Sequence, residues 1–142
     1  MARSTGDGNV LKYSWGDRLP PADKSGNFAD FTTRNFLGNV LADYDDNFLG
    51  TSPIGYFDAN FNGLYDLSGN VSEWVHDVYG SVSGLSSGKE TDPLGVDIGK
   101  YHTIRGSSWA HGSVTELRLS YRDFGEEGRN DLGFRIARYL EE

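Results

Sequence analysis

Glycine is the residue that most constrains how this chain can fold. It fills 19 of the 142 positions, whereas only 4 are proline, and aromatic residues reach 13%. Glycine permits the positive-φ backbone that tight turns need, and it weakens the interiors of helices and strands. Disordered chains, by contrast, are poor in aromatic residues. The composition therefore predicts a compact fold of many turns held together by large rings.

Acidic residues outnumber basic ones by 21 to 13, which gives a net charge of -8. The one dense basic group, Arg129, Arg135 and Arg138, is interrupted by acids. Such a surface repels a phosphate backbone, so nucleic-acid binding is not expected, whereas hard cations suit oxygen-rich turns. No apolar run approaches the roughly 20 residues of a membrane span, and none is expected.

Cysteine is absent. This excludes disulfides, thiolate metal sites and a cysteine nucleophile within these residues, and it leaves the redox compartment open. Residues 1–12 are interpreted as a flexible N-terminal segment or an expression boundary, because they start polar and glycine-rich without the apolar stretch of a signal peptide. Residues 13–142 are interpreted as one domain, since no linker divides them.

Two segments predict helices. In residues 70–79, apolar side chains recur at helical spacing, and Glu73 lies three residues after Asn70, as in a capping box. The apolar positions are Val71, Trp74, Val75 and Val78. A second, short helix is expected to begin near Ser113 and to include residues 115–119.

Elsewhere the pattern favours short strands and loops. Residues 101–105 and 132–139 alternate well enough to predict strands. Long loops are expected at 23–30, 43–50 and 80–88. Loops of that length in a compact domain are either functional or held in place by a ligand or contact.

Three sequence blocks occur in a fixed order. The first is Tyr13-Ser-Trp-Gly-Asp17 followed by Gly26-Asn-Phe-Ala-Asp30. The second is Ser52-Pro-Ile-Gly55 followed by Asn62-Gly-Leu-Tyr-Asp-Leu-Ser-Gly-Asn-Val-Ser-Glu-Trp-Val75. The third is Ile104-Arg-Gly-Ser-Ser-Trp109, then Leu117-Arg-Leu-Ser-Tyr-Arg122 and Leu132-Gly-Phe-Arg135.

Together these blocks resemble the formylglycine-generating-enzyme, or sulfatase-modifying-factor, domain family, from about Tyr13 to Tyr139. The resemblance is to the C-terminal part of the family domain. It implies an α+β fold that is irregular, turn-rich and C-type-lectin-like, with little regular secondary structure. That expectation agrees with the glycine content and the scarce periodicity.

The resemblance also implies two calcium sites. One would use the side chains of Asp66 and Glu73 with the carbonyls of Gly69 and Val71; the other would use the side chains of Asn27 and Asp46 with the carbonyls of Phe28 and Phe48. The first set has physical sense, because a turn at Gly69 can point carbonyls at one ion while Glu73 returns toward it. The alternative is that Glu73 is only a capping residue and Asp66 a turn residue.

Two acidic segments imitate an EF-hand loop without completing it. Residues 58–66 match its first nine positions, but Gly69 stands at the twelfth, where a bidentate Glu is needed. Residues 43–48 lack the glycine of the sixth position. Neither segment is expected to be an EF-hand.

In the family, two cysteines bind copper and oxidise a substrate cysteine. The first follows the motif matched by Arg105–Trp109 by two residues, and here that position is His111. The second falls within residues 114–116, which hold no thiol. Copper(I) prefers thiolate ligands, so neither copper nor this oxidation is expected, and no catalytic residue is assigned. The other histidines, His76 and His102, lack the spacing of a metal motif.

These features favour a non-oxidase member of the family, a calcium-stabilised binding or accessory module. Its protein or glycan ligand would lie in a lectin-like groove formed by Arg105, Ser107, Trp109 and His111. Two alternatives stay open. One is an enzyme whose catalytic elements lie in a missing N-terminal region or a partner chain. The other is a calcium-dependent carbohydrate-binding protein, which rests on fold analogy because the usual Glu-Pro-Asn and Gln-Pro-Asp sugar motifs do not occur.

Localisation is not fixed by the sequence. Weakly binding calcium modules suit extracytoplasmic settings, which favours that location slightly. An export signal is not visible in the sequence, and a cytoplasmic location stays open.

Overall fold

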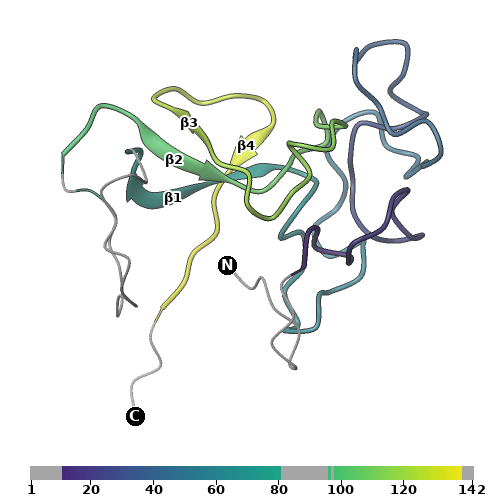
Figure 1. Cartoon of the computed structure of the whole chain (residues 1–142), viewed down its shortest axis with the longest axis horizontal. Helices are drawn as coiled ribbons and strands as arrows, with labels where there is room; N and C mark the ends of the chain where they lie inside the picture. The colour runs from purple at the N-terminus through teal and green to yellow at the C-terminus, as the bar shows by residue number, and fades with distance from the viewer. Residues whose placement is uncertain (1–10, 81–95, 97, 139–142) are drawn as a thin grey trace.

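The computed structural model describes residues 11–80, 96 and 98–138. Four strands form one curled sheet: β1 (Ser72–Val78), β2 (His102–Arg105), β3 (Asp123–Gly125) and β4 (Leu132–Gly133). Their order is β3-β2-β1-β4; β2 pairs antiparallel with β1 and β3, and β4 pairs parallel with β1. Figure 1 shows this sheet on one side of the molecule and a region of long loops on the other.

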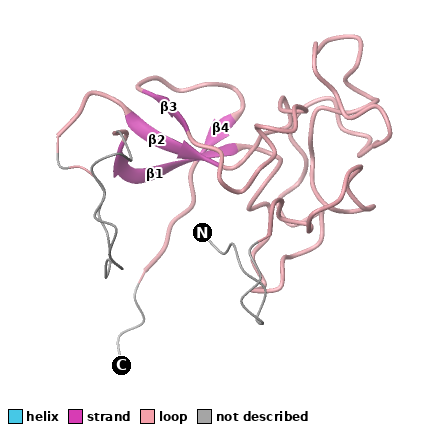
Figure 2. Cartoon of the chain, in the orientation of Figure 1, coloured by secondary structure: helices cyan, strands magenta, loops and turns pink. Residues whose placement is uncertain are grey.

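The described residues contain no helix (Figure 2), so the α part of the expected α+β class is not confirmed. The irregular, turn-rich character is confirmed, because most of the described chain lies outside the four strands. Nothing in the described part of the chain is a helix long and apolar enough to cross a membrane.

The helix predicted at residues 70–79 is wrong, because most of this segment is strand β1. The register between β1 and β2 shifts between Trp74 and Val78, so this irregular strand does not follow strict alternation. Valine favours the pleated surface of a sheet, and pairing with β2 and β4 on both sides outweighs the local capping pattern. Glu73 does not cap a helix here, since its carboxylate binds Arg135.

The second predicted helix, at residues 115–119, is also wrong. It is a single turn, in which the Leu117 N–H donates to the Ser113 carbonyl at 3.2 Å. Ser113 and Glu116 do exchange the side-chain bonds of a capping box. The chain then leaves helical geometry, because the Leu119 N–H donates to the Lys12 carbonyl at 2.9 Å.

The predicted strands and loops agree with the structure in part. Residues 101–105 contain β2 as expected, but the predicted strand at 132–139 shortens to β4 and continues as irregular chain to residue 138. Residues 23–30 and 43–50 are loops, as predicted. Of the loop predicted at 80–88, all but the first residue lies outside the described residues, as does residue 139.

Aromatic rings fill the core of the loop region. Tyr13, Phe28, Tyr44 and Leu117 are buried together, and Trp15 and Leu41 pack against them. Trp15 stacks on Tyr13 with ring centroids 4.8 Å apart, and it tilts against Phe28 at 5.0 Å. Rings therefore replace helix and sheet packing as the apolar support of this half of the molecule.

Separate segments of the chain meet at Asn70. Its N–H donates to the Asn27 carbonyl, and its carbonyl accepts from the Trp109 N–H, both at 2.9 Å. Its side chain pairs with both backbone groups of Ser52, at 3.0 and 3.2 Å. Asn70 has a φ of 62°, a left-handed conformation that asparagine tolerates better than most residues. The neighbouring Gly69 has a φ of 91°.

Replacing Gly69 with alanine should destabilise the fold by about 2–4 kcal/mol. The new Cβ would stand 2.7 Å from the Asn27 carbonyl oxygen and 2.9 Å from its nitrogen, at a positive φ. Urea unfolding measures the loss. Gly128→Ala is the matched control, because its Cβ would meet nothing within 4 Å. Equal stability of the two variants would contradict the view that Gly69 is needed where these segments meet at Asn70.

Candidate functional site

The four predicted groove residues lie at and just after the end of β2. The guanidinium of Arg105 binds backbone carbonyls: its Nη1 donates to the Tyr121 carbonyl at 2.6 Å and its Nη2 to the Leu119 carbonyl at 2.8 Å. These bonds fasten the end of β2 to the segment that leads into β3. Arg105 thus acts as a structural clamp in this conformation.

The two serines of the motif are buried. Ser107, 1% exposed, shares a hydroxyl hydrogen bond of 2.7 Å with Ser68. Ser108, fully buried, donates to Asp131 at 2.8 Å, and Asp131 also accepts from Arg129 at 3.2 Å. Both hydroxyl groups are thus used within the scaffold and are shielded from solvent in this conformation.

His111 closes a tight turn with Ser108. Its Nδ1 accepts from the Ser108 N–H at 3.1 Å, and its own N–H donates to the Ser108 carbonyl at 3.1 Å. An accepting Nδ1 places the proton of the neutral ring on Nε2. The His111 carbonyl accepts from the Ala29 N–H at 3.1 Å, which ties this turn to the loop region. The ring therefore stabilises the local backbone.

Trp109 is partly buried, and its indole N–H has no hydrogen-bond partner. A cavity of about 190 Å³ and another of about 280 Å³ lie in the described structure, and neither is lined by any of the four groove residues. The expected ligand groove therefore stays a prediction.

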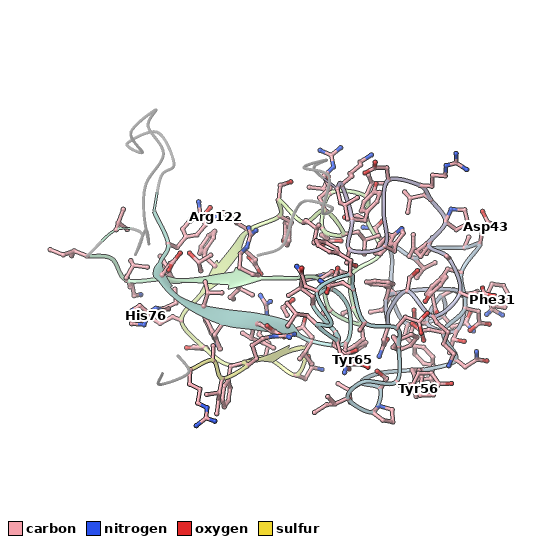
Figure 3. The ribbon with its side chains drawn as sticks, turned by 90° about the horizontal axis from the view of Figure 1, so that it is seen from below. Phe31, Asp43, Tyr56, Tyr65, His76 and Arg122 are labelled. Atoms are coloured by element: carbon pink, nitrogen blue, oxygen red, sulfur yellow. The ribbon has the colours of Figure 1, made fainter. Side chains whose placement is uncertain are left out.

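His76 and His102 are exposed on the sheet. Figure 3 shows His76 at the opposite end of the molecule from Asp43, which lies in the loop region. Within the part of the chain that the structure describes, no group of three or more His, Cys, Asp or Glu side chains is arranged to hold a metal. Each expected calcium set has only one or two carboxylates and relies otherwise on amide and carbonyl oxygens.

The structure places the expected set of Asn27, Phe28, Asp46 and Phe48 side by side. One oxygen of Asp46 accepts from the Phe28 N–H and the other from the Phe48 N–H, both at 2.8 Å. Asn27 is 1% exposed and donates through Nδ2 to the Gly50 carbonyl at 2.7 Å. Its Oδ1 is buried and accepts no hydrogen bond. Such an unpartnered oxygen is uncommon in a folded protein and indicates a missing donor or cation.

Two carboxylates are buried at this place. Asp46 is 5% exposed, and its N–H donates at 2.5 Å to Asp30, which is fully buried. The pKa of Asp46 is raised to about 7, mainly by burial and also by the charge of Asp30, while the N–H donors of Phe48 and Phe28 oppose the rise. The ion pairs found among the described residues include neither acid. Carboxylate and amide oxygens, such as those of Asp46 and Asn27, are ligand types that a hard cation prefers.

The second expected set is arranged differently. Asp66 accepts from the Gly55 N–H at 2.8 Å through one oxygen, while its other oxygen is buried without a partner. Both oxygens of Glu73 accept from the Nε of Arg135, at 2.9 and 2.6 Å. Gly69 and Val71 lie between the two acids along the chain, at the approach to β1. Sequence patterns did not identify the Arg135 contact, since 62 positions separate the pair.

The family profile described as "Sulfatase-modifying factor enzyme 1-like domain" matches residues 1–140. The chain belongs to this family. The predicted membership is confirmed, and His111 stands in a sulfatase-modifying-factor-like domain that contains no cysteine.

Curated relatives are longer than this domain. "Serine/threonine-protein kinase Pkn1" of Chlamydia trachomatis is 36% identical over 91 residues, which cover 62% of this chain and 15% of the relative. "Inactive C-alpha-formylglycine-generating enzyme 2" of Mus musculus is 33% identical over 132 residues, covering 88% of this chain and 36% of the relative. The chain thus spans well under half the length of each.

Among solved structures, the fold is similar to that of PvdO from Pseudomonas aeruginosa. The TM-score is 0.59 at 21% identity, over 91% of this chain and 45% of that chain. This likeness shows that the irregular loop region and small sheet together form a recurring fold.

His111→Ala should lower the free energy of unfolding by about 1–3 kcal/mol, because the partly buried Ser108 N–H would lose its acceptor. His111→Asn offers a side-chain oxygen in place of Nδ1 and should retain most of the stability. Urea unfolding of both variants gives the comparison. An alanine variant as stable as the parent would remove the structural role assigned to His111.

Proposed function

We propose that this chain is a non-oxidase member of the sulfatase-modifying-factor family, a calcium-stabilised binding or accessory module. The observation that carries the proposal is the absence of cysteine from a chain that keeps the family's motif blocks. The position of the first redox cysteine holds His111, whose ring nitrogen already accepts a backbone hydrogen bond.

The residues that stand in place of the two copper-binding cysteines support this proposal. In residues 114–116, where the second cysteine is expected, Glu116 accepts from the hydroxyl of Ser113 at 2.6 Å and from its N–H at 3.2 Å. An imidazole and a carboxylate that are both used by the scaffold are poor substitutes for two thiolates, which copper(I) prefers.

Calcium enters the proposal as a structural ion. When bound by Asn27, Phe28, Asp46 and Phe48, it would give buried carboxylate charge a counter-ion and fill the lone pairs of the Asn27 amide oxygen. The side chains would hold two long loops against each other. No reaction step passes through the ion.

The relatives support an accessory role. One relative is named an inactive formylglycine-generating enzyme, so loss of this activity has a precedent among similar proteins. Another is named a protein kinase, and the similar part is 15% of its length. A domain of this kind therefore occurs within a longer protein.

A protein ligand is favoured over a glycan by the apolar surface of the loop region. Large apolar side chains are exposed there, and such groups on a folded domain commonly mark contacts with other proteins. They include Phe31, Phe36, Leu49, Ile54, Tyr56, Phe61 and Tyr65. Figure 3 shows Tyr56 and Tyr65 near each other at the edge of this region.

The second candidate is an enzyme whose catalytic elements lie outside these residues. It is favoured by one observation: the match to PvdO covers only 45% of that chain. More than half of that protein lies outside the part that is similar to this chain.

The purified chain should form no aldehyde on a cysteine-containing sulfatase peptide in the presence of copper and oxygen, because it has no thiolate pair. Mass spectrometry of the peptide detects the product, and an active formylglycine-generating enzyme serves as the positive control. Aldehyde formation above the level of peptide alone would contradict the proposal.

A glycan array separates the lectin alternative from a protein-binding module. Binding to defined glycans that is lost in chelator would favour calcium-dependent carbohydrate recognition. An array without such a signal leaves the protein-binding module as the better account.

A further inference from the structure

We propose that the sheet carries a binding site for an ammonium group, the side-chain end of a lysine on a protein partner. The site is the cavity of about 280 Å³ that Trp74 and Val75 of β1 and His102 of β2 line on one side. Glu126 and Gly128 line it from the segment between β3 and β4. This inference rests on the proposed binding role, and it names a place and a ligand chemistry for that role.

Strand pairing brings the rings of the cavity together. Trp74 pairs with Ile104, and His102 faces the same side as Ile104 because side chains alternate along a strand. The His102 ring stands edge-on to the Trp74 ring, with centroids 6.3 Å apart. Gly125 pairs with His102, and a Cβ at Gly125 would lie 3.3 Å from the Trp74 ring. Strand β3 can therefore lie close to the indole.

The polar groups of the cavity have few partners within the protein. The imidazole of His102 is exposed, and no hydrogen bond joins its ring to another described residue. Glu126 forms one ion pair, in which Oε2 lies 3.0 Å from the ammonium of Lys100. The side chains of this pair are 50% and 66% exposed, and exposed pairs of this kind are weak. Glu126 can therefore exchange its partner for another cation.

The ammonium of Lys100 shows which kind of ligand these groups hold. It lies 3.0 Å from Glu126 and 5.4 Å from the centroid of the Tyr101 ring, so a carboxylate and an aromatic ring already share one ammonium. The cavity offers the same combination, with the Trp74 indole as the ring. A neutral imidazole adds a nitrogen that accepts a hydrogen bond. These groups attract a cation, whereas Glu126 would repel an anion.

The surrounding charge also favours a cation. Arg129 directly follows the cavity residue Gly128, and its charge is compensated by Asp123 at 2.8 Å and by Asp131 at 3.2 Å. The exposed Glu127 adds a further negative charge to this segment. Over longer distances, the net charge of -8 attracts basic partners.

The volume suits a single side chain. Pockets for whole small molecules measure about 300–1,000 Å³, and this cavity, at about 280 Å³, lies just below that range. A lysine carries its ammonium on a four-carbon stem, and such stems commonly lie along apolar surface. Trp74 and Val75 offer that surface here. A protein partner can thus place one lysine in the cavity while the rest of the partner stays outside.

Titration of the full chain with Nα-acetyl-lysine methylamide, followed by ¹H–¹⁵N spectra, tests the proposal. We expect a saturable shift of the Trp74 indole signal. Glu126→Gln should weaken binding about tenfold, because the ammonium loses its carboxylate partner. The matched control Glu127→Gln removes the same charge outside the cavity and should change binding by less than about twofold. Lys100→Gln should strengthen binding, because it removes the internal competitor.

Nα,Nε-Diacetyl-lysine methylamide is the ligand control, because it keeps the stem of lysine and lacks its charge; it should not shift the Trp74 signal. The proposal is overturned if the parent shows no saturable shift, or if the neutral ligand binds equally well. Equal weakening in Glu126→Gln and Glu127→Gln would also overturn it, since that result indicates only general attraction to an acidic surface. If Glu126→Gln does not fold, the Lys100→Gln variant and the neutral ligand still decide. A negative result leaves the non-oxidase role standing, because the aldehyde assay tests that role separately.

Discussion

The fold depends on the left-handed turn at Asn70, where all three motif blocks meet. The backbone of Asn70 bonds to Asn27 of the first block and to Trp109 of the third, while its side chain holds Ser52 at the start of the second. Gly69 allows these segments to approach each other closely, because a Cβ there would overlap the Asn27 backbone. The motif that identifies the family is thus a set of contacts between loops.

The contacts around Asn70 do not depend on cysteine. Backbone hydrogen bonds and buried hydroxyl hydrogen bonds hold the Ser107–His111 segment and the start of β1 in place. None of these contacts uses a thiol. His111 contributes a ring nitrogen to the same network. A chain without cysteine can therefore keep the family fold.

Local sequence patterns predicted the features that depend on neighbouring residues in the chain. Glycine and aromatic content indicated a turn-rich fold, and alternation located β2. The helix at 70–79 was wrong because β1 is stabilised by β2 and β4, which lie far away along the chain and leave no mark on its own pattern. The pairing of Glu73 with Arg135 was not predicted for the same reason. The resemblance named both calcium sets, and both stay predictions; Arg135 pairs with Glu73 of one of them.

The thermal unfolding midpoint in calcium and in chelator tests the central claim most directly, namely that a bound cation completes the loop region. A ligand that binds only the folded state adds about 2.7 kcal/mol when its concentration is 100-fold above Kd. We predict a midpoint several degrees higher in millimolar calcium than in chelator. The same midpoint in both conditions would contradict the account.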